Sequence, residues 1–257
     1  MLERELVLYR QLQAQGIRIG FVTYGDRGDL QYADQLPGLQ ILCNRWGWPG
    51  PIYEQLLPWL HAGWLRRSNV FKTNQANGAD VALKAARLWH KPLIARCGYM
   101  WSDQAARGGP ERAAEVARAR RLEDKVFKAA DQVVVTTPAL REYIVKNYAL
   151  SPLKIEIVPN YVLTDLFAPA PDGGNPVPNR LCFVGRLSQL KNPHLLVRAC
   201  AGLEVELVFV GDGPLRSSVA ELAADLKVNL RLLGNLPHRE LPQILRQSAI
   251  FFIGLTN

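Results

Sequence analysis

The 257-residue sequence contains few of the groups that hold metal ions or close disulfides. Its four cysteines form no C-x-x-C pair; they are Cys43, Cys97, Cys182 and Cys200. This usage argues against a zinc site and a disulfide framework, and it is typical of a reducing compartment. No apolar run approaches the length of a membrane span, and the first residues form a charged helical pattern rather than a signal peptide. We therefore expect a cytoplasmic protein without a metal site.

Two further absences narrow the class of function. No G-x-G-x-x-G follows a predicted strand and no acidic residue ends the next strand, so a nicotinamide-dependent oxidoreductase is a weak hypothesis. The formal net charge of +8 permits anionic partners such as nucleotide phosphates, acidic lipid headgroups or nucleic acid. Neither a lysine-rich tail nor an aromatic-basic module stands out, so nucleic acid is the least expected of the three.

The most informative stretch is LCFVGRLSQLKNPHLLVRACAGLEVELVFVGDGPLR. Residues 181–184 and 205–210 are apolar runs typical of buried parallel strands, and each ends in a glycine turn. A helix is predicted between them, with Asn192 as its N-cap. Its inward-facing residues are predicted to be Leu195, Leu196 and Ala199. The pattern is that of a βαβ unit, in which ligands lie beyond the carboxyl ends of the strands.

The first of these glycine turns predicts a diphosphate site. Gly185 permits close approach of a ligand to the backbone, Arg186 offers a fork for phosphate oxygens, and Lys191 adds a point charge. The following helix start would add unpaired N–H groups. The alternative is that the glycines are only turn residues and the cations are solvated; for Gly211 and Gly213 taken alone, we prefer that alternative.

The segments FVGRLSQLKNP, LVFVGDGPLR, NLRLLGNLP and LPQILRQSAIFFI occur in this order over residues 180–253. Together they resemble the donor domain of a GT-B fold glycosyltransferase, and they are most similar to the retaining family 4. The resemblance implies a nucleotide-diphosphate sugar as donor substrate, with no cofactor and no bound metal. Arg186 and Lys191 would contact the diphosphate. The residues that would border the donor or its nucleobase are Gly211, Asp212, Gly213, Gly234, Asn235 and Leu236.

Alternating strands and helices predict an α/β fold with two Rossmann-like parallel-sheet domains, the second one partial. We expect an acceptor-side domain at 1–167, a linker rich in proline and glycine at 168–179, and a nucleotide-sugar-binding domain at 180–257. Polar residues end two strands of the first domain, and the resemblance places the acceptor there; they are Lys72, Asn74, Arg96 and Tyr99. Where many members of the family carry a histidine after the strand that ends near Ala95, this chain has Arg96, Cys97 and Gly98, so the catalytic residues stay unassigned.

All six tryptophans lie between Trp46 and Trp101, several of them in a segment that ends in Arg66 and Arg67. The preferred interpretation is an aromatic core with a solvated basic end. The alternative is an interfacial patch that meets lipid or a lipid-linked acceptor. Residues 1–167 carry 22 basic and 16 acidic residues, so peripheral contact with anionic membranes is expected through this domain.

The sequence departs from the family pattern at both ends. The family's first strand and glycine loop precede the first helix, and two donor-holding glutamates follow the strand that matches residues 250–253. From these departures we expect an incomplete chain with little transferase activity as it stands. The main hypothesis is a glycosyltransferase that acts on a sugar or lipid-linked acceptor. The alternative is a non-catalytic nucleotide or nucleotide-sugar binding remnant.

Overall fold

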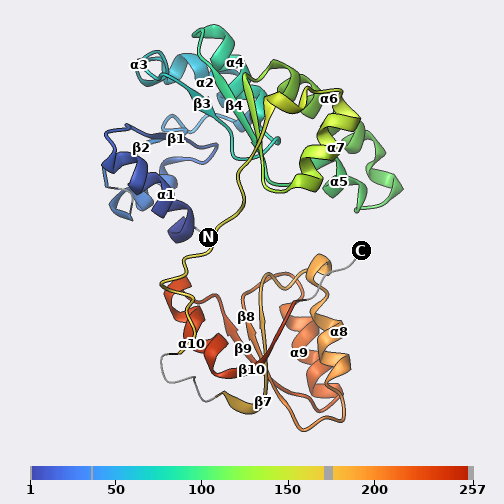
Figure 1. Cartoon of the computed structure of the whole chain (residues 1–257). Helices are drawn as coiled ribbons and strands as arrows, with labels where there is room; N and C mark the ends of the chain where they lie inside the picture. Colours follow the sequence, from blue (N-terminus) through green and yellow to red (C-terminus); the bar gives the residue numbers. More distant parts are fainter. Residues whose placement is uncertain (1, 36, 171–175, 254–257) are drawn as a thin grey trace. The chain divides into compact units, whose positions relative to one another are not determined.

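The computed structural model describes residues 2–35, 37–170 and 176–253 (Figure 1). The chain divides into two compact units, a larger one of residues 9–161 and a smaller one of residues 162–257 together with 1–8. Parts of the expected linker (171–175) and of the expected second domain (254–257) lie outside the described residues. The domain boundaries expected from the sequence remain a prediction.

The larger unit contains six short parallel strands that fall into two sheets. Residues 9–14 of helix α1 (Leu2–Ala14) belong to this unit, and its strands are β1 (Gly20–Val22), β2 (Gln40–Leu42), β3 (Phe71–Lys72), β4 (Leu93–Cys97), β5 (Gln132–Val135) and β6 (Ile155–Ile157). Strands β1 and β2 pair with each other, and the other four form a sheet in the order β3-β4-β5-β6. The helices of this unit are α2 (Gly50–Leu60), α3 (Ala62–Leu65), α4 (Ala79–Leu88), α5 (Trp101–Ala106), α6 (Ala113–Ala129) and α7 (Pro138–Tyr148).

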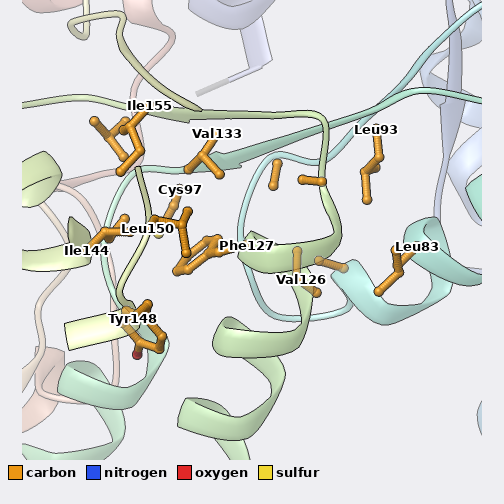
Figure 2. Close-up of a cluster of buried hydrophobic side chains, with 14 of the residues drawn as sticks. Leu83, Leu93, Cys97, Val126, Phe127, Val133, Ile144, Tyr148, Leu150 and Ile155 are labelled. Atoms are coloured by element: carbon orange, nitrogen blue, oxygen red, sulfur yellow. The ribbon is translucent and has the colours of Figure 1, made fainter. Parts of the chain in front are cut away.

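The core of the four-stranded sheet is built on α6. Figure 2 shows Phe127 of this helix beneath Val133 of β5, with Val126 on the side toward Leu83 and Ile144 of α7 on the other side; Val126, Phe127, Val133 and Ile144 are fully buried. The buried positions of α6 recur every three or four residues, which is the spacing of one helix face. Because β4 alternates buried and half-buried residues, its inward side chains complete the same core.

The smaller unit has one continuous parallel sheet. Its elements are β7 (Val177–Val184), α8 (Pro193–Ala199), β8 (Glu206–Val210), α9 (Arg216–Asp225), β9 (Asn229–Gly234), α10 (Leu241–Arg246) and β10 (Ser248–Phe252). The strand order is β10-β7-β8-β9. The central strand β8 is buried from Leu207 to Val210, as a parallel strand covered on both faces should be. The alternating strands and helices agree with the expected α/β fold.

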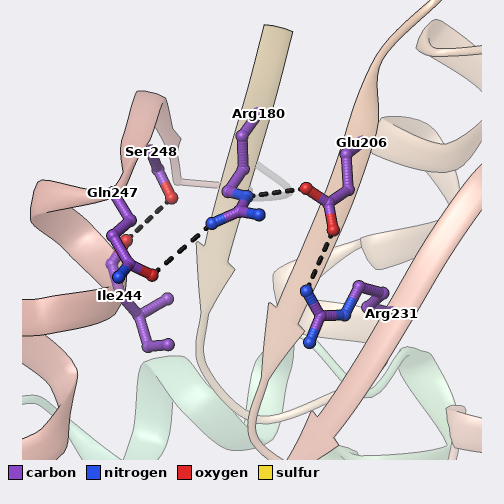
Figure 3. Close-up of polar contacts among 6 residues, drawn as sticks. All are labelled: Arg180, Glu206, Arg231, Ile244, Gln247 and Ser248. Atoms are coloured by element: carbon purple, nitrogen blue, oxygen red, sulfur yellow. Dashed lines mark hydrogen bonds and ion pairs between the residues drawn. The ribbon is translucent and has the colours of Figure 1, made fainter. Parts of the chain in front are cut away.

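Glu206 fixes the register at the amino end of this sheet (Figure 3). Its carboxylate accepts hydrogen bonds from Arg180 of β7 at 2.7 Å and from Arg231 of β9 at 3.0 Å. Arg180 also donates to the Gln247 side chain at 3.5 Å, beside the start of β10. The pKa of the Glu206 carboxyl lies below its usual value, mainly because of the hydrogen bond from Arg180 and then because of the hydrogen bond from Arg231. This ionic cluster lies at the opposite end of the strands from the glycine turns, so it stabilises the sheet rather than a ligand site.

Candidate functional site

The carboxyl ends of β7, β8 and β9 meet at one edge, and backbone hydrogen bonds join their turns. The N–H of Leu187 donates to the carbonyl of Asp212 at 3.0 Å. The N–H of Gly211 donates to the carbonyl of Gly234 at 2.7 Å. The structure therefore brings the three predicted donor-side turns together into one surface of the smaller unit.

Two of the glycines at this edge are required by the packing of the turns. A Cβ on Gly211 would collide with the carbonyl oxygen of Gly185, and its φ of +124° is one that other residues rarely adopt. A Cβ on Gly213 would collide with the carbonyl oxygen of Leu187. The turn interpretation therefore explains Gly211 and Gly213, as the sequence suggested.

The two cations predicted to bind phosphate, Arg186 and Lys191, form no side-chain hydrogen bond or ion pair with the described residues. Arg186 is exposed on the turn after β7, and Lys191 is half-buried at the end of a short 3-10 helix, Gln189–Lys191. Their charges are therefore available to an anion that approaches the edge.

The start of α8 differs from the prediction in two respects. Asn192 occupies the N-cap position, but it adopts a left-handed backbone with a φ of +42° and its side chain makes no capping hydrogen bond. Leu195 is exposed, and so is Ala199. Leu196 is buried as predicted, and the other inward residues of the helix are Pro193 and Val197, with Cys200 just beyond it. Two of the three residues predicted to face inward are therefore exposed.

The sequence reasoning gave no role to Arg216, the first residue of α9. Its Nη1 atom is buried, lies 3.8 Å from the Asp212 carboxylate, and makes no hydrogen bond among the described residues. Its Nη2 atom donates to the carbonyl of Leu232 at 3.5 Å, near the end of β9. A third cation thus lies between two of the glycine turns. Its position two residues after the Gly-Asp-Gly-Pro turn could have indicated this.

Three of the four predicted acceptor-side residues meet at the carboxyl edge of β3 and β4. Lys72 donates to the side chain of Asn74 at 2.8 Å. Arg96 donates to the Asn74 carbonyl at 3.5 Å and to the Asn160 side chain at 3.1 Å. Tyr99 follows β4 and is 48% exposed. No local sequence pattern indicates the contact between Arg96 and Asn160, which lie 64 positions apart in the chain.

A buried acid anchors the turn that carries Tyr99. Glu123 of α6 is fully buried and accepts hydrogen bonds from the Ser102 N–H at 3.0 Å and the Tyr148 hydroxyl at 2.6 Å. Burial, then the charge of Glu123, raises the pKa of the neighbouring Cys97 thiol to about 12. Cys97 donates to the Tyr99 carbonyl at 3.0 Å. A thiol with so high a pKa is not a nucleophile at neutral pH, so this cysteine has a packing role.

A cavity of about 340 Å³ lies between β1 and β3 in the larger unit. Its wall is mostly apolar and includes Phe21, Phe71, Leu57 and Ala85, while Lys72 lies at its polar side. Within residues 2–35, 37–170 and 176–253, no group of three or more His, Cys, Asp or Glu residues could hold a metal ion. Over the same residues, no helix has the length and apolar character needed to cross a membrane.

The preferred interpretation of the tryptophan segment as aromatic core is wrong for three of its residues. Trp46, Trp48 and Trp59 are 44%, 38% and 48% exposed. Trp64 is half-buried against the core formed by Tyr53 and its neighbours.

Comparisons with known proteins match both halves of the chain to sugar-transfer enzymes. The model of Glycosyltransferase Family 4 matches residues 6–166, and that of Glycosyl transferases group 1 matches residues 170–256. A D-inositol 3-phosphate glycosyltransferase of Kineococcus radiotolerans is 37% identical over 198 residues, 74% of this chain and 43% of that protein. The chain thus spans about two fifths of the length of this relative.

Two solved structures share the fold. HepE of Anabaena, in complex with UDP and glucose, has a TM-score of 0.70 at 15% identity, over 93% of this chain and 66% of that chain. Sucrose-phosphate synthase of Thermosynechococcus elongatus has a TM-score of 0.74 at 17% identity, over 96% of this chain and 69% of that chain. At such low identity these structures show the fold alone, which is the GT-B fold. Because the first family model covers well over half of the sequence, this chain belongs to glycosyltransferase family 4.

Proposed function

We propose that this protein is a glycosyltransferase that moves a sugar from a nucleotide-diphosphate sugar to an acceptor. The observation that carries the proposal is the pair of uncommitted cations, Arg186 and Lys191, beside glycine turns at the carboxyl edge of β7. A diphosphate is the ligand that such an edge suits, because a guanidinium fork and an ammonium group both bind phosphate oxygens. UDP and glucose in the HepE complex give further support to a nucleotide-sugar donor.

The reaction would break the bond between the anomeric carbon and the diphosphate, and negative charge would develop on the leaving group. Arg186 and Lys191 would stabilise that charge, and Arg216 would hold Asp212 and the turns in place. These cations would do the work of a metal ion, so we propose a metal-independent transfer. Family 4 membership favours retention of configuration at the anomeric carbon.

The turns would contact other parts of the donor. Gly211, Asp212 and Gly213 would border the sugar and phosphates, because their turn packs directly against the turn at Gly185. The end of β9 and the loop after it would lie near the nucleobase; the residues are Gly234, Asn235 and Leu236.

The cluster of Lys72, Asn74 and Arg96, together with Tyr99, would bind the acceptor. Its hydrogen bonds hold two cations in fixed positions at the edge of the larger unit. A hydroxyl-bearing sugar or a lipid-linked sugar is the acceptor class we propose. We further propose that the enzyme is cytoplasmic and contacts anionic membranes peripherally, since residues 1–167 carry most of the positive charge.

A transfer assay tests this function. The protein is incubated with radiolabelled UDP-, GDP- or ADP-sugars and a panel of sugar and lipid-linked acceptors, with and without a chelator. Formation of a product with the donor's anomeric configuration, undiminished by the chelator, is the expected result. Binding of a nucleotide sugar without transfer to any acceptor would favour the alternative, a non-catalytic nucleotide-sugar binding protein.

A further inference from the structure

Helix α6 carries a carboxylate into the interior of the larger unit. The Glu123 side chain is fully buried, and each of its two oxygens accepts one hydrogen bond, from the Ser102 N–H and from the Tyr148 hydroxyl. No lysine or arginine among the described residues forms an ion pair with it. Burying a charge without a counter-ion is costly, so an acid at this position needs an explanation beyond packing.

The Glu123 carboxylate supplies the cap that α5 lacks. This helix starts after Met100, an apolar residue whose side chain makes no capping hydrogen bond. The first N–H groups of a helix have no partner within it, and an N-cap side chain normally accepts from one of them. Here Ser102, the second residue of α5, donates its N–H to Glu123 at 3.0 Å. The negative charge also lies at the positive end of the helix, so Glu123 caps α5 from the neighbouring helix α6.

The turn between β4 and α5 is held at its other end by side chains of the sheet. The Gln75 side chain accepts a hydrogen bond from the Gly98 N–H at 3.2 Å, and the Thr136 hydroxyl donates to the Gly98 carbonyl at 3.4 Å. The Cys97 thiol donates to the Tyr99 carbonyl at 3.0 Å. Tyr99 lies between these contacts and the start of α5, and its side chain is half exposed. This residue is therefore presented by a short turn that is held at both ends.

We propose that Glu123 is a positioning residue for the acceptor, because its cap on α5 fixes the turn that presents Tyr99. A binding edge whose groups are already in place binds its ligand without a further loss of conformational freedom. Without the cap, the turn would sample other conformations and acceptor binding would have to order it. The proposal rests on the acceptor site in the proposed function. It predicts an effect on the acceptor and none on the donor, whose candidate site belongs to the other unit.

Hydrogen exchange of the ligand-free protein tests the cap. Glu123→Gln keeps the size of the side chain but removes its charge, and the two donors, Ser102 and Tyr148, then face a single acceptor oxygen. The amides of residues 98–106 should exchange about tenfold faster than in the wild type, since a charge-assisted hydrogen bond is lost at the start of α5. Mass spectrometry of peptic fragments follows this segment separately from the rest of the chain.

Tyr148→Phe is the matched control for overall stability. It leaves one oxygen of the buried carboxylate without a donor, so it should lower the urea midpoint, as Glu123→Gln should. The cap on Ser102 remains, so residues 98–106 should exchange at close to the wild-type rate. Asp124→Asn, at the next position of α6, removes only an exposed ion pair with Lys128 and should change neither measurement.

The transfer assay links the cap to the acceptor. With the acceptor of the panel that yields product, the KM for that acceptor should rise about tenfold in Glu123→Gln. The affinity for the nucleotide sugar, measured by calorimetry, should stay at the wild-type value. Tyr148→Phe should keep a wild-type KM, so a general loss of stability would not reproduce the effect.

Two results would overturn the proposal. One is equal exchange of residues 98–106 in Glu123→Gln and Tyr148→Phe, since the cap would then contribute nothing specific to the turn. The other is faster exchange in Glu123→Gln with no rise in the acceptor KM. Absence of transfer by the wild type to every acceptor would count against the proposed function itself. Hydrogen exchange, measured without ligand, would still decide whether Glu123 fixes the turn.

Discussion

The two units form their candidate edges in different ways. In the smaller unit the turns are joined by backbone hydrogen bonds and by glycines in close contact, and the strands form one sheet whose central strand is buried from Leu207 to Val210. In the larger unit the edge is held by side chains, mainly Lys72, Asn74, Arg96 and Asn160, and a cavity separates β1 from β3. An edge held by its backbone keeps its shape when its cations are replaced. An edge held by side chains changes whenever one of them is replaced.

The largest effect is expected from Gly211→Ala. The new Cβ collides with the Gly185 carbonyl, and alanine must also adopt a strained φ. The free energy of unfolding should therefore fall by about 3 kcal/mol or more. Urea denaturation measures this loss. Gly202→Ala is the control, since its φ is also positive but nothing lies within 4 Å of the added Cβ. It should cost about 1 kcal/mol. Equal losses in the two variants would show that the packing of the turns contributes nothing.

A smaller effect is expected from Arg96→Ala in the larger unit. The variant loses charged hydrogen bonds to Asn74 and Asn160, which should cost about 1–2 kcal/mol because the site is only partly buried. We also expect a lower rate with acceptor at unchanged donor affinity. Arg141→Ala removes a hydrogen bond to the Pro152 carbonyl and serves as the control, which should not affect the acceptor. A donor affinity that falls with Arg96→Ala would contradict the division of labour between the edges.

The smallest effect is expected from Ala85→Val. This buried residue lines the cavity beside β3, so two added methyl groups should enter empty space and stabilise the larger unit by about 0.5–1 kcal/mol. The equivalent change in the close-packed smaller unit, Ala223→Val, should be destabilising by about 1–3 kcal/mol through overpacking. Thermal unfolding distinguishes the two. A loss of stability in both variants would mean that the cavity cannot accommodate the two added methyl groups of Ala85→Val.

Local patterns in the sequence predicted what depends on local chemistry. The glycine turns at Gly185 and Gly211, the strand that ends at Val210 and the positions of the two cations all follow from short-range signals. Local patterns could not predict which side of α2 is buried. The helix is apolar on both sides, and only its neighbour α4 determines which side is covered. Long-range contacts such as the hydrogen bond from Arg96 to Asn160 could not be predicted either, since no local residue pattern indicates them.

The predicted start of β7 shows the same limit. Its apolar run begins at Leu181, yet the strand extends back to Val177 because it pairs there with β10. The face of α8 was misjudged for a related reason. A helix of seven residues has too few turns for the spacing of its apolar residues to define a single face.

Calorimetry of donor binding tests the central claim, that Arg186 and Lys191 bind the diphosphate of a nucleotide sugar. UDP-, GDP- and ADP-glucose are titrated into the wild-type protein, Arg186→Ala, Lys191→Ala and the control Arg198→Ala, an exposed cation at the far end of α8. We expect one nucleotide sugar to bind the wild type and the control equally. Each single loss of a charge-assisted contact should weaken its affinity by about tenfold or more. Unchanged affinity in Arg186→Ala and Lys191→Ala, with their folds intact, would contradict the account.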